Sequence, residues 1–408
     1  MNNYHRTPFT EIATLIRGVS YDKSVVSTSE QEGCIPILRA NNIQNSLVLN
    51  DLVYVPNDFV KEEQMIREGD IVLAMSSGSK DLVGKSAQAD KDINAAFGTF
   101  CGLIRAKESV DSKFLGLYFQ TQEYRNFVSY QSKGVNICNL KKKDVESLQI
   151  PLPPLPTQHL IVSRIESLFA ELDKAVEHLR TAQQQLKTFK QAVLNHWLNN
   201  EDEKWETVKL GEVLDRIEAG KSFRCNEKVP ALHEKGIVKI SAVTWGEFKE
   251  DECKTITNEE LYNPKYRICE GDLLMSRANT IQLVGNCVLV RNKPARNIML
   301  SDKVLRLVPN GCIDPKYTLY SLRTTNCRLQ IQTMSTGNQD SMRNIGQDRI
   351  KKIQIHLPPL SEQQRIVQEI ESRLSQAEAA EARIAEALQK TEALRQSILK
   401  KAFSGELV

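Results

Sequence analysis

The chain has 408 residues, enough for two or three domains, and its 54 basic and 51 acidic side chains leave a net charge of +3. This balance excludes a disordered polyelectrolyte and a histone-like basic protein. Nine cysteines without a C-x-x-C pair argue against a disulfide framework or a zinc ribbon. The lack of an apolar run long enough for a signal peptide or a membrane span predicts a cytoplasmic protein with no membrane partner.

Residues 1–152 are predicted to form one mixed α/β domain. Short β-like runs at Ile35 to Leu38 and Ile71 to Ala74 precede a helical stretch at Asp111 to Tyr130. Polar loops follow the strands, and their amide, hydroxyl and basic side chains suit contacts to DNA bases and phosphates. Loops of this composition also occur at the strand ends of any α/β domain. The candidate DNA-binding residues of this half are Arg39, Asn41, Asn42, Gln44, Ser77, Ser79, Lys80, Lys133 and Asn136.

A long spacer helix is predicted within residues 153–200. The proline pair Pro153-Pro154 ends the preceding element, and Thr157, which follows it, is the expected N-cap. Apolar residues then recur every seven positions, which predicts coiled-coil packing. One row of this repeat is Ile165, Leu172, Leu179, Leu186 and Val193. The other row is Ile161, Leu168, Ala175, Ala182 and Phe189.

Residues 201–357 are predicted to form a second α/β domain. Its β-like runs are Val238 to Ile240, Leu273 to Met275 and Val304 to Val308, again followed by polar loops. Asn and Gln can bond adenine through two hydrogen bonds, and Arg can bond guanine in the same way. The candidate DNA-binding residues of this half are Ser241, Thr244, Arg277, Asn279, Thr280, Asn338, Gln339 and Arg343.

A second spacer helix is predicted within residues 358–408. Ser361 is the expected N-cap, and Gln364 stands at the spacing of a capping box. The heptad positions of this helix are richer in alanine than those of the first. One row of its repeat is Ile370, Ala377, Ile384, Thr391 and Ile398. The other row is Ile366, Arg373, Ala380, Ala387 and Leu394.

The chain is a tandem duplicate of one domain-plus-helix unit. Asn139 to Leu155 aligns without gaps on Asn344 to Leu360, with seven of seventeen positions identical at an offset of 205. Upstream, Glu68-Gly69-Asp70 matches Glu270-Gly271-Asp272. Because large residues of one helix fit small residues of the other, we expect the helices to pair within the chain as an antiparallel coiled coil. The two domains would then be related by a pseudo-twofold axis, which suits a bipartite DNA site.

Motifs for catalysis are missing from the sequence. It contains no G-x-G-x-x-G, G-x-x-x-x-G-K-[ST], H-E-x-x-H or G-x-S-x-G. Asn263-Pro264-Lys265-Tyr266 lacks the second proline of the N-P-P-Y/F site of amino-methyltransferases. We therefore expect no catalytic residue, no metal site and no cofactor in this chain.

Several motifs resemble the specificity subunit of type I restriction-modification systems. They are the W-x-x-V-x-L-G-E start at Trp205 to Glu212, the two E-G-D strands, the segment Pro358 to Gln363 and the C-terminal segment Ala402 to Leu407. The resemblance covers essentially the whole chain. The first copy departs from the pattern at Thr157-Gln158, where Glu-Gln is usual, and residues 1–12 lack the Trp opening.

The resemblance implies a non-catalytic subunit that binds double-stranded DNA. Each domain would be a target recognition domain for one half of a split, asymmetric sequence, and the helices would set the spacer between the halves. Two copies of the methyltransferase subunit would bind the helices, and restriction subunits would join them. S-adenosylmethionine, ATP and Mg would belong to those partners.

Two other classes of function are weighed against this one. The first is a coiled-coil adaptor between proteins, whose globular ends bind no DNA. The second is a self-sufficient methyltransferase, which the missing cofactor motifs disfavour. Adjacency of the gene to a methyltransferase gene would separate the specificity subunit from the adaptor, and mapping of methylated DNA sites with and without the gene is the most informative experiment.

Overall fold

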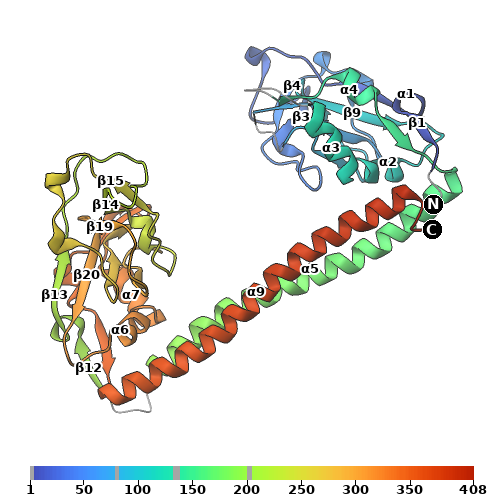
Figure 1. Ribbon diagram of the computed structural model, residues 1–408. Coiled ribbons are helices and arrows are strands. Elements are labelled where there is room, and N and C mark those ends of the chain that lie inside the picture. Colours follow the sequence, from blue (N-terminus) through green and yellow to red (C-terminus); the bar gives the residue numbers. More distant parts are fainter. Residues whose placement is uncertain (1–3, 79–81, 132–137, 200–204) are drawn as a thin grey trace. The chain divides into compact units, whose positions relative to one another are not determined.

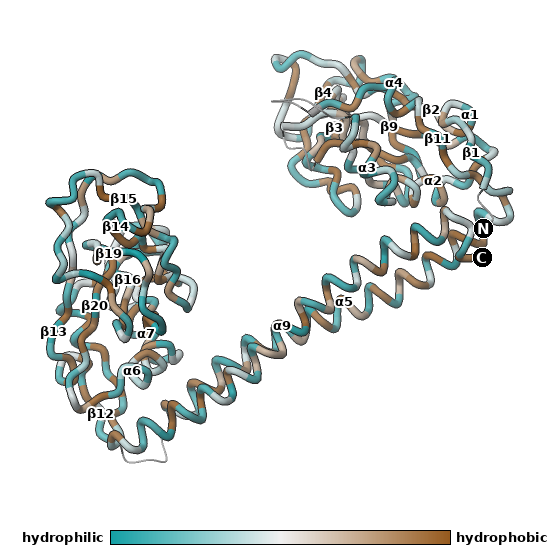
Figure 2. The backbone as a smooth tube through the Cα atoms, viewed as in Figure 1, coloured by the Kyte–Doolittle hydropathy of each residue, from teal (hydrophilic) through white to brown (hydrophobic). Residues whose placement is uncertain are grey.

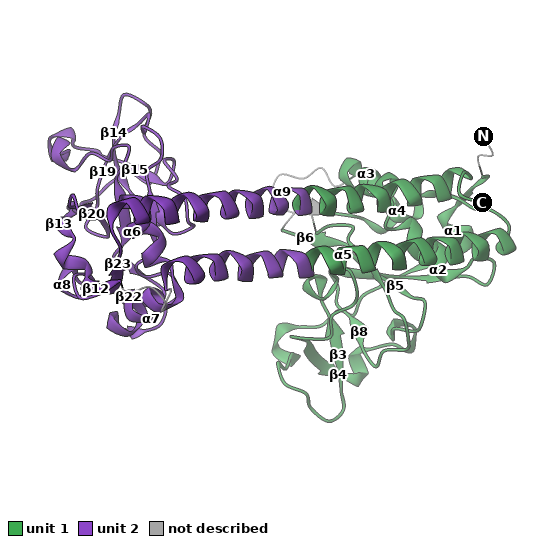
Figure 3. Ribbon diagram, turned by 90° about the horizontal axis from the view of Figure 1, so that it is seen from below, with its two compact units in different colours: residues 1–180, 385–408 green, residues 181–384 purple. Residues whose placement is uncertain are grey.

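The computed structural model describes residues 4–78, 82–131, 138–199 and 205–408. The chain divides into two compact units (Figure 3). Unit 1 comprises residues 1–180 and 385–408, and unit 2 comprises residues 181–384. Both long helices are therefore shared between the units, whereas the sequence analysis assigned each helix to a separate spacer segment, residues 153–200 and 358–408.

The globular part of unit 1 has eleven described strands and four short α-helices (Figure 1). The strands are β1 (Arg6–Pro8), β2 (Ala13–Arg17), β3 (Cys34–Leu38), β4 (Val53–Pro56), β5 (Ile71–Ala74), β6 (Ser76–Ser77), β7 (Ser86–Gln88), β8 (Ala96–Phe97), β9 (Cys101–Ala106), β10 (Cys138–Asn139) and β11 (Gln149–Pro151). The helices are α1 (Phe9–Ile12), α2 (Ser112–Tyr118), α3 (Gln122–Gln131) and α4 (Lys142–Glu146).

The globular part of unit 2 follows nearly the same order, with the 3-10 helix η5 (Leu210–Glu212) at the place of α1 and one additional described strand, β21. Its strands are β12 (Glu206–Lys209), β13 (Leu214–Ala219), β14 (Lys235–Val238), β15 (Cys253–Thr255), β16 (Leu273–Ser276), β17 (Ala278–Asn279), β18 (Cys287–Leu289), β19 (Asn297–Met299), β20 (Val304–Pro309), β21 (Thr336–Gln339), β22 (Met342–Asn344) and β23 (Gln354–Leu357). Its helices are α6 (Pro315–Leu322), α7 (Thr325–Met334) and α8 (Gln347–Ile350).

Each unit is built on a four-stranded antiparallel sheet, in the order β2-β9-β5-β7 or β13-β20-β16-β18. A three-stranded sheet accompanies each, in the order β4-β3-β8 or β15-β14-β19. In β5, Ile71 packs in the core beside the helices while Val72 packs in a second core, because alternate side chains of a strand point to opposite faces. In β16, Leu273 and Leu274 alternate in the same way. Mixed α/β domains in tandem duplicate, as expected from the sequence, are confirmed.

Two details of the predicted elements are wrong. The helical stretch from Asp111 to Tyr130 is two helices, because the Thr121 hydroxyl accepts the Tyr124 N–H and so begins a second helix. Thr324 caps α7 in the same way by accepting the Cys327 N–H. The run at Val238 to Ile240 marks the end of a strand, since β14 stops at Val238 and a 3-10 helix, η6 (Ile240–Val243), follows.

The two long helices are α5 (Leu155–Leu198) and α9 (Leu360–Ser404). Both begin before the expected caps, so Thr157 and Ser361 lie inside the first turn and the predicted capping box is wrong. The buried residues Gln158 and Gln363, which match at the offset of 205, secure these starts instead. Gln158 accepts the Asp111 N–H (2.9 Å) and donates to the Pro153 carbonyl (2.8 Å). Gln363 accepts the Asp314 N–H (2.8 Å) and donates to the Pro358 carbonyl (2.8 Å).

In each unit the start of one long helix lies antiparallel to the end of the other, as predicted. In unit 1, Arg395 of α9 pairs with Asp173 of α5 and stacks over Phe169, 4.6 Å from its ring centre. In unit 2, Lys190 Nζ lies 2.6 Å from Glu381 Oε2. The predicted rows Ile165, Leu172, Leu179, Leu186, Val193 and Ile370, Ala377, Ile384, Thr391, Ile398 are buried or half-buried throughout. The apolar positions recur at intervals along both helices (Figure 2).

The second predicted row is less well buried than the first, since Ala175 and Arg373 within it and Phe189 and Leu394 at its last position are exposed. Phe189 and Leu394, again a matched pair, are 43% and 51% exposed. An α-helix has 3.6 residues per turn, so positions repeated every 3.5 residues drift away from the partner over several turns.

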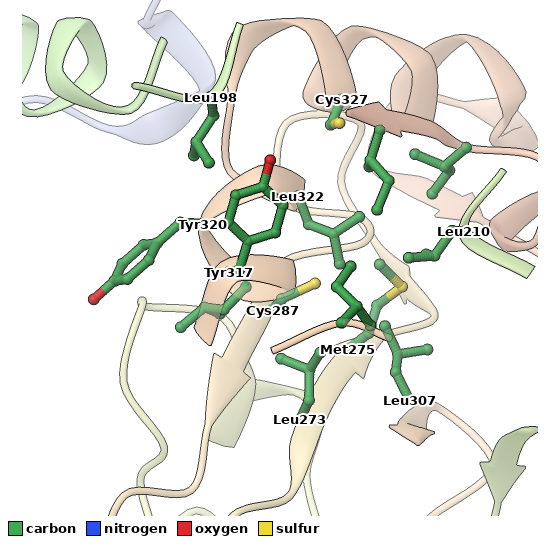
Figure 4. Close-up of a cluster of buried hydrophobic side chains, with 14 of the residues drawn as sticks. Leu198, Leu210, Leu273, Met275, Cys287, Leu307, Tyr317, Tyr320, Leu322 and Cys327 are labelled. Atoms are coloured by element: carbon green, nitrogen blue, oxygen red, sulfur yellow. The ribbon is translucent and has the colours of Figure 1, made fainter. Parts of the chain in front are cut away.

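Each globular core is completed by both long helices. In unit 1, Ile165 near the start of α5 and Phe403 near the end of α9 join one buried cluster with Phe114. In unit 2 the corresponding buried cluster contains Ile370 of α9 and Leu198 of α5. Leu198 is drawn together with Tyr317 and Cys327 of this cluster in Figure 4. Full burial of one such side chain contributes about 1.5–3 kcal/mol, so the helix ends are integral parts of both domains.

Candidate nucleic-acid interface

Candidate residues from distant parts of the sequence meet at one edge of unit 2. Strands β17, β22 and β21 form a three-stranded antiparallel sheet, in which Asn279 pairs with Arg343 and Ala278 with Asn344. The sheet therefore brings the segment Arg277 to Thr280 beside the segment Asn338 to Arg343. The sequence could name these segments but contained no signal that they adjoin.

A third predicted segment, around η6, joins this edge. Asn279 Nδ2 donates to Thr244 Oγ1 (3.3 Å), and Asn286 Nδ2 donates to the Thr244 carbonyl (2.8 Å). Thr244 is buried, and the Ser241 hydroxyl donates to Glu252 (2.6 Å). Thr244 and Ser241 thus hold the edge together, and their hydroxyls already have partners.

The hairpin of β21 and β22 presents the most exposed polar side chains of this edge. Asn338 and Gln339 are exposed. Arg343, predicted as a base contact, turns its guanidinium back onto the hairpin and donates to the carbonyls of Ser335 (2.8 Å) and Gly337 (2.9 Å). Arg343 therefore fixes the hairpin, while Asn338 and Gln339 remain able to contact DNA.

Three exposed side chains complete this edge. Arg277 is exposed beside the half-buried Thr280. The sequence analysis did not select Trp245, which is 64% exposed, or Met342, which is 70% exposed. Apolar and aromatic side chains at such an edge can pack on thymine methyl groups or between base steps. Their signal was available, because each directly adjoins a selected polar segment.

Unit 1 has the corresponding edge in part. Strand β6 pairs with β10, so Ser77 lies opposite Cys138, and the Leu140 N–H donates to the Met75 carbonyl (2.8 Å). The predicted residues Ser79, Lys80, Lys133 and Asn136 lie outside the described residues. Ser77 is half-buried in the strand.

The remaining candidates of unit 1 lie on the 3-10 helix η2 (Ala40–Asn42) and next to it. Asn42 is only 1% exposed, and its amide donates to the carbonyls of Val48 (2.9 Å) and Asn50 (2.8 Å). Its Oδ1 accepts the Arg39 N–H (2.9 Å), so the amide of Asn42 serves the loop. Arg39 pairs with Asp51 (3.1 Å). Asn41 and Gln44 are exposed.

Two observations bear on catalysis. Burial raises the pKa of Cys101 and Cys287 to about 12, so these thiols stay protonated and behave as apolar side chains. Among the described residues, no group of His, Cys, Asp or Glu side chains could hold a metal ion.

The helices that the structure describes include none with the length and hydropathy of a membrane span.

Comparison with known proteins assigns the family. The type I restriction modification DNA specificity domain matches residues 3–179 and 202–390, once for each repeat. The chain belongs to this family. It is 33% identical to the specificity subunit of the type I restriction enzyme EcoKI from Escherichia coli K12, over 98% of this chain and 88% of that protein. It is also 33% identical to the StySPI specificity subunit of Salmonella potsdam, with the same coverage.

Two solved structures share the fold. One, from work on complex assembly and conformational transition of the type I R-M system, has a TM-score of 0.73 at 21% identity, covering 100% of this chain and 99% of that one. The HsdS subunit from Thermoanaerobacter tengcongensis has a TM-score of 0.54 at 20% identity, covering 99% of this chain and 97% of that one. Membership of the specificity-subunit family gives this chain a role in DNA sequence specificity.

Proposed function

We propose that each unit of this specificity subunit recognises one half of a bipartite, asymmetric DNA site. The observation that carries the proposal is a repeated framework with different polar edges. Gln158 and Gln363 make matching bonds in the two units. At the matched edge, β6 has Ser76-Ser77 where β17 has Ala278-Asn279. A constant framework with variable polar residues is what recognition of two different half-sites requires.

The long helices, in this proposal, set the spacer and bind partner subunits. Each unit presents exposed apolar side chains on the long helices, among them Leu394 in unit 1 and Phe189 in unit 2. Because these two positions match in the repeat, the same partner surface could bind at both, which supports two copies of one methyltransferase subunit. Restriction subunits would join that cytoplasmic complex.

The chain itself is proposed to be non-catalytic. S-adenosylmethionine would belong to the methyltransferase subunits, and ATP and Mg to the restriction subunits. This chain would contribute DNA recognition and the geometry of assembly. Its net charge of +3 is small for a DNA-binding protein, which fits an assembly whose partner subunits share the phosphate contacts.

The direct test is to map methylated sites in cells with and without the gene. The proposal predicts that one split motif with a fixed spacer loses its methylation on deletion. If every methylated motif survived deletion, the chain would not specify methylation, and an adaptor without DNA recognition would be the better account.

A second test addresses the spacer. Deleting the matched heptads 177–183 and 382–388 shortens both helices by the same amount and preserves the heptad phase. The motif should keep both half-sites and change its spacer length. A motif with the original spacer would contradict the role of the helices.

A further inference from the structure

A pocket of about 360 Å³ opens in unit 2 between the end of α5 and the globular domain. Gln191 of α5, Gly246, Asn286 and the two arginines Arg323 and Arg328 lie in its wall. This volume is within the range of ~300–1,000 Å³ found for ligand pockets. Among the residues that the structure describes, no carboxylate lies in its wall.

The two arginines hold their positions through backbone carbonyls. Arg323 Nη2 donates to the carbonyls of Gly246 (2.6 Å) and Cys287 (2.8 Å). Arg328 Nη2 donates to the carbonyls of Gln282 (3.0 Å) and Val284 (2.8 Å). Arg328 Nη1 is buried and has no hydrogen-bond partner among the described residues. Each fork is thus fixed in place with N–H groups left over.

The positive charge of this pair is not neutralised. Within the described part of the chain, neither guanidinium lies within 4.0 Å of a carboxylate. The charge of Glu247 acts on Arg323 from a neighbouring pocket and is opposed by that of Arg291. Burial lowers the pKa of both arginines, as expected for cations that lack a counter-ion. An anion in the pocket would supply that charge.

The pocket adjoins the candidate DNA interface. Asn286 in its wall donates to the Thr244 carbonyl, and Thr244 accepts from Asn279 of β17. Gly246, whose carbonyl holds Arg323, follows the exposed Trp245. The pocket therefore lies directly beside the edge that is proposed to contact DNA.

We propose that the pocket binds one phosphate of the DNA backbone beside the half-site of unit 2, with Arg323 as the contacting residue. This inference rests on the proposed function and adds a contact that positions the duplex without selecting its sequence. Because both Nη2 N–H groups of Arg323 are held by backbone carbonyls, its Nη1 and Nε N–H groups are the ones that can donate charge-assisted hydrogen bonds to a phosphate oxygen. Contacts of this kind fix the register of a protein on DNA.

The matched positions of unit 1 show which of the two arginines is shared by both units. Arg125 matches Arg328 and donates to the Val83 carbonyl (3.4 Å), as Arg328 does to that of Val284. Gln120 takes the place of Arg323. Gln396 donates to the Gln120 carbonyl (3.2 Å), just as Gln191 donates to the Arg323 carbonyl (3.2 Å). The fold thus accepts glutamine at this position, and only the additional charge is special to unit 2.

The variant R323Q installs the residue of the matched position and removes the proposed contact. The full-length chain, purified with its methyltransferase subunits, is titrated with site-containing and site-free duplexes between 50 and 200 mM salt. R323Q should weaken both by about tenfold. It should also reduce the slope of log K against log salt by about one. K352Q removes an exposed charge away from the pocket and should leave the slope unchanged.

A methylphosphonate scan identifies the phosphate. Neutral methylphosphonates replace successive phosphates around the unit 2 half-site. At one position the methylphosphonate should weaken DNA binding by the wild type but not by R323Q. If R323Q folds poorly, R323K, which keeps the charge without the fork, is scanned instead, and that position should respond less than in the wild type. Equal responses of variant and wild type at every position would overturn the contact.

An experiment with inorganic phosphate distinguishes a phosphate of the DNA backbone from a free anion as the occupant of the pocket. Without DNA, phosphate at constant ionic strength should raise the melting temperature of the wild type more than that of R323Q. The same result with a flat methylphosphonate scan would assign the pocket to a free anion and overturn the DNA contact. Failure of the proposed function looks different, since the wild type itself would then show no preference for site-containing DNA.

Discussion

Units 1 and 2 share their internal supports and differ at their polar edges. In both, a buried glutamine ties the start of a long helix to the globular domain, and a lysine bridges the two, as Lys113–Glu166 in unit 1 and Lys316–Glu371 in unit 2. A turn glycine with positive φ, Gly84 or Gly285, packs where a Cβ would come within 2.6 Å of a helix side chain. The supports were preserved after duplication while the edges diverged.

The difference at the edges teaches how one scaffold can acquire two specificities. Met75 of unit 1 stands where unit 2 has the exposed Arg277, and Ser77 stands where unit 2 has Asn279. Ser77 and Asn279 lie on short strands whose backbone pairing is the same in both units, and Met75 and Arg277 immediately precede these strands. Side chains there can change without loss of the fold, because the strand pairing depends on backbone groups.

The largest effect is expected from the shared glutamines. Q363A should cost about 4 kcal/mol, because it leaves the Asp314 N–H and the Pro358 and Cys312 carbonyls buried without partners. Q158A should cost about 3 kcal/mol, since Gln158 bonds one N–H and one carbonyl.

Chemical denaturation of the full-length chain measures the loss of stability caused by Q363A and by Q158A. All three tryptophans (Trp197, Trp205 and Trp245) belong to unit 2, so tryptophan fluorescence follows that unit. Q363A should shift the fluorescence transition and Q158A should shift mainly the far-UV signal. The exposed neighbour Gln364 provides the control, and Q364A should stay within about 0.5 kcal/mol of the wild type. A Q363A protein as stable as Q364A would refute the shared support.

An intermediate loss of stability is expected at an ion pair that the two units share but that has an additional partner in unit 2. Both units pair a buried aspartate with an arginine, Asp70 with Arg105 and Asp272 with Arg306. Only unit 2 adds Glu218, which accepts hydrogen bonds from Arg306 (2.7 Å) and Arg216 (2.6 Å). E218Q should therefore destabilise unit 2 by about 2 kcal/mol at neutral pH. R216Q changes a 60% exposed partner and should cost less than about 1 kcal/mol.

The effect of E218Q should depend on pH. Burial alone would raise the pKa of Glu218, but the hydrogen bonds from the two arginines outweigh it and hold this pKa below its ordinary value. Its stabilisation is then complete above the pKa of the unfolded chain and is lost as the pH falls through the folded-state pKa. The difference in stability between E218Q and the wild type should shrink as the pH falls below the ordinary pKa of a glutamate and vanish below the folded-state pKa of Glu218. Denaturation curves that stay apart there would contradict this assignment.

The smallest effect on stability is expected at the exposed hairpin of unit 2. N338A combined with Q339A should weaken binding to the cognate site by about 1–3 kcal/mol and relax the preference at one half-site only. Stability should not change, because both side chains are exposed. Binding to duplexes with randomised half-sites measures this. Relaxed preference at the other half-site would break the division of labour between the units.

The sequence predicted the architecture because its signals are periodic or repeated. The offset of 205 residues, the heptad rows and the proline pairs each belong to long stretches, and all three appear in the structure. Ile165 and Val193 were selected from period alone and both are buried.

The sequence was less informative about individual polar side chains. Asn42 and Arg343 have the composition of base contacts, yet their partners are backbone carbonyls of their own loops. Such partners depend on loop conformation, which residue type does not specify. That Phe403 would complete the core of unit 1 also had no local signal, because Phe114 lies far from it in the chain.

The central claim is that each globular part specifies one half-site independently of the other. The most direct test replaces residues 206–357 by a second copy of residues 6–152, keeping both long helices, and maps DNA methylation in cells that carry the chimera. The account predicts a motif in which both halves are the half-site of unit 1. A motif that keeps the half-site of unit 2 would contradict it.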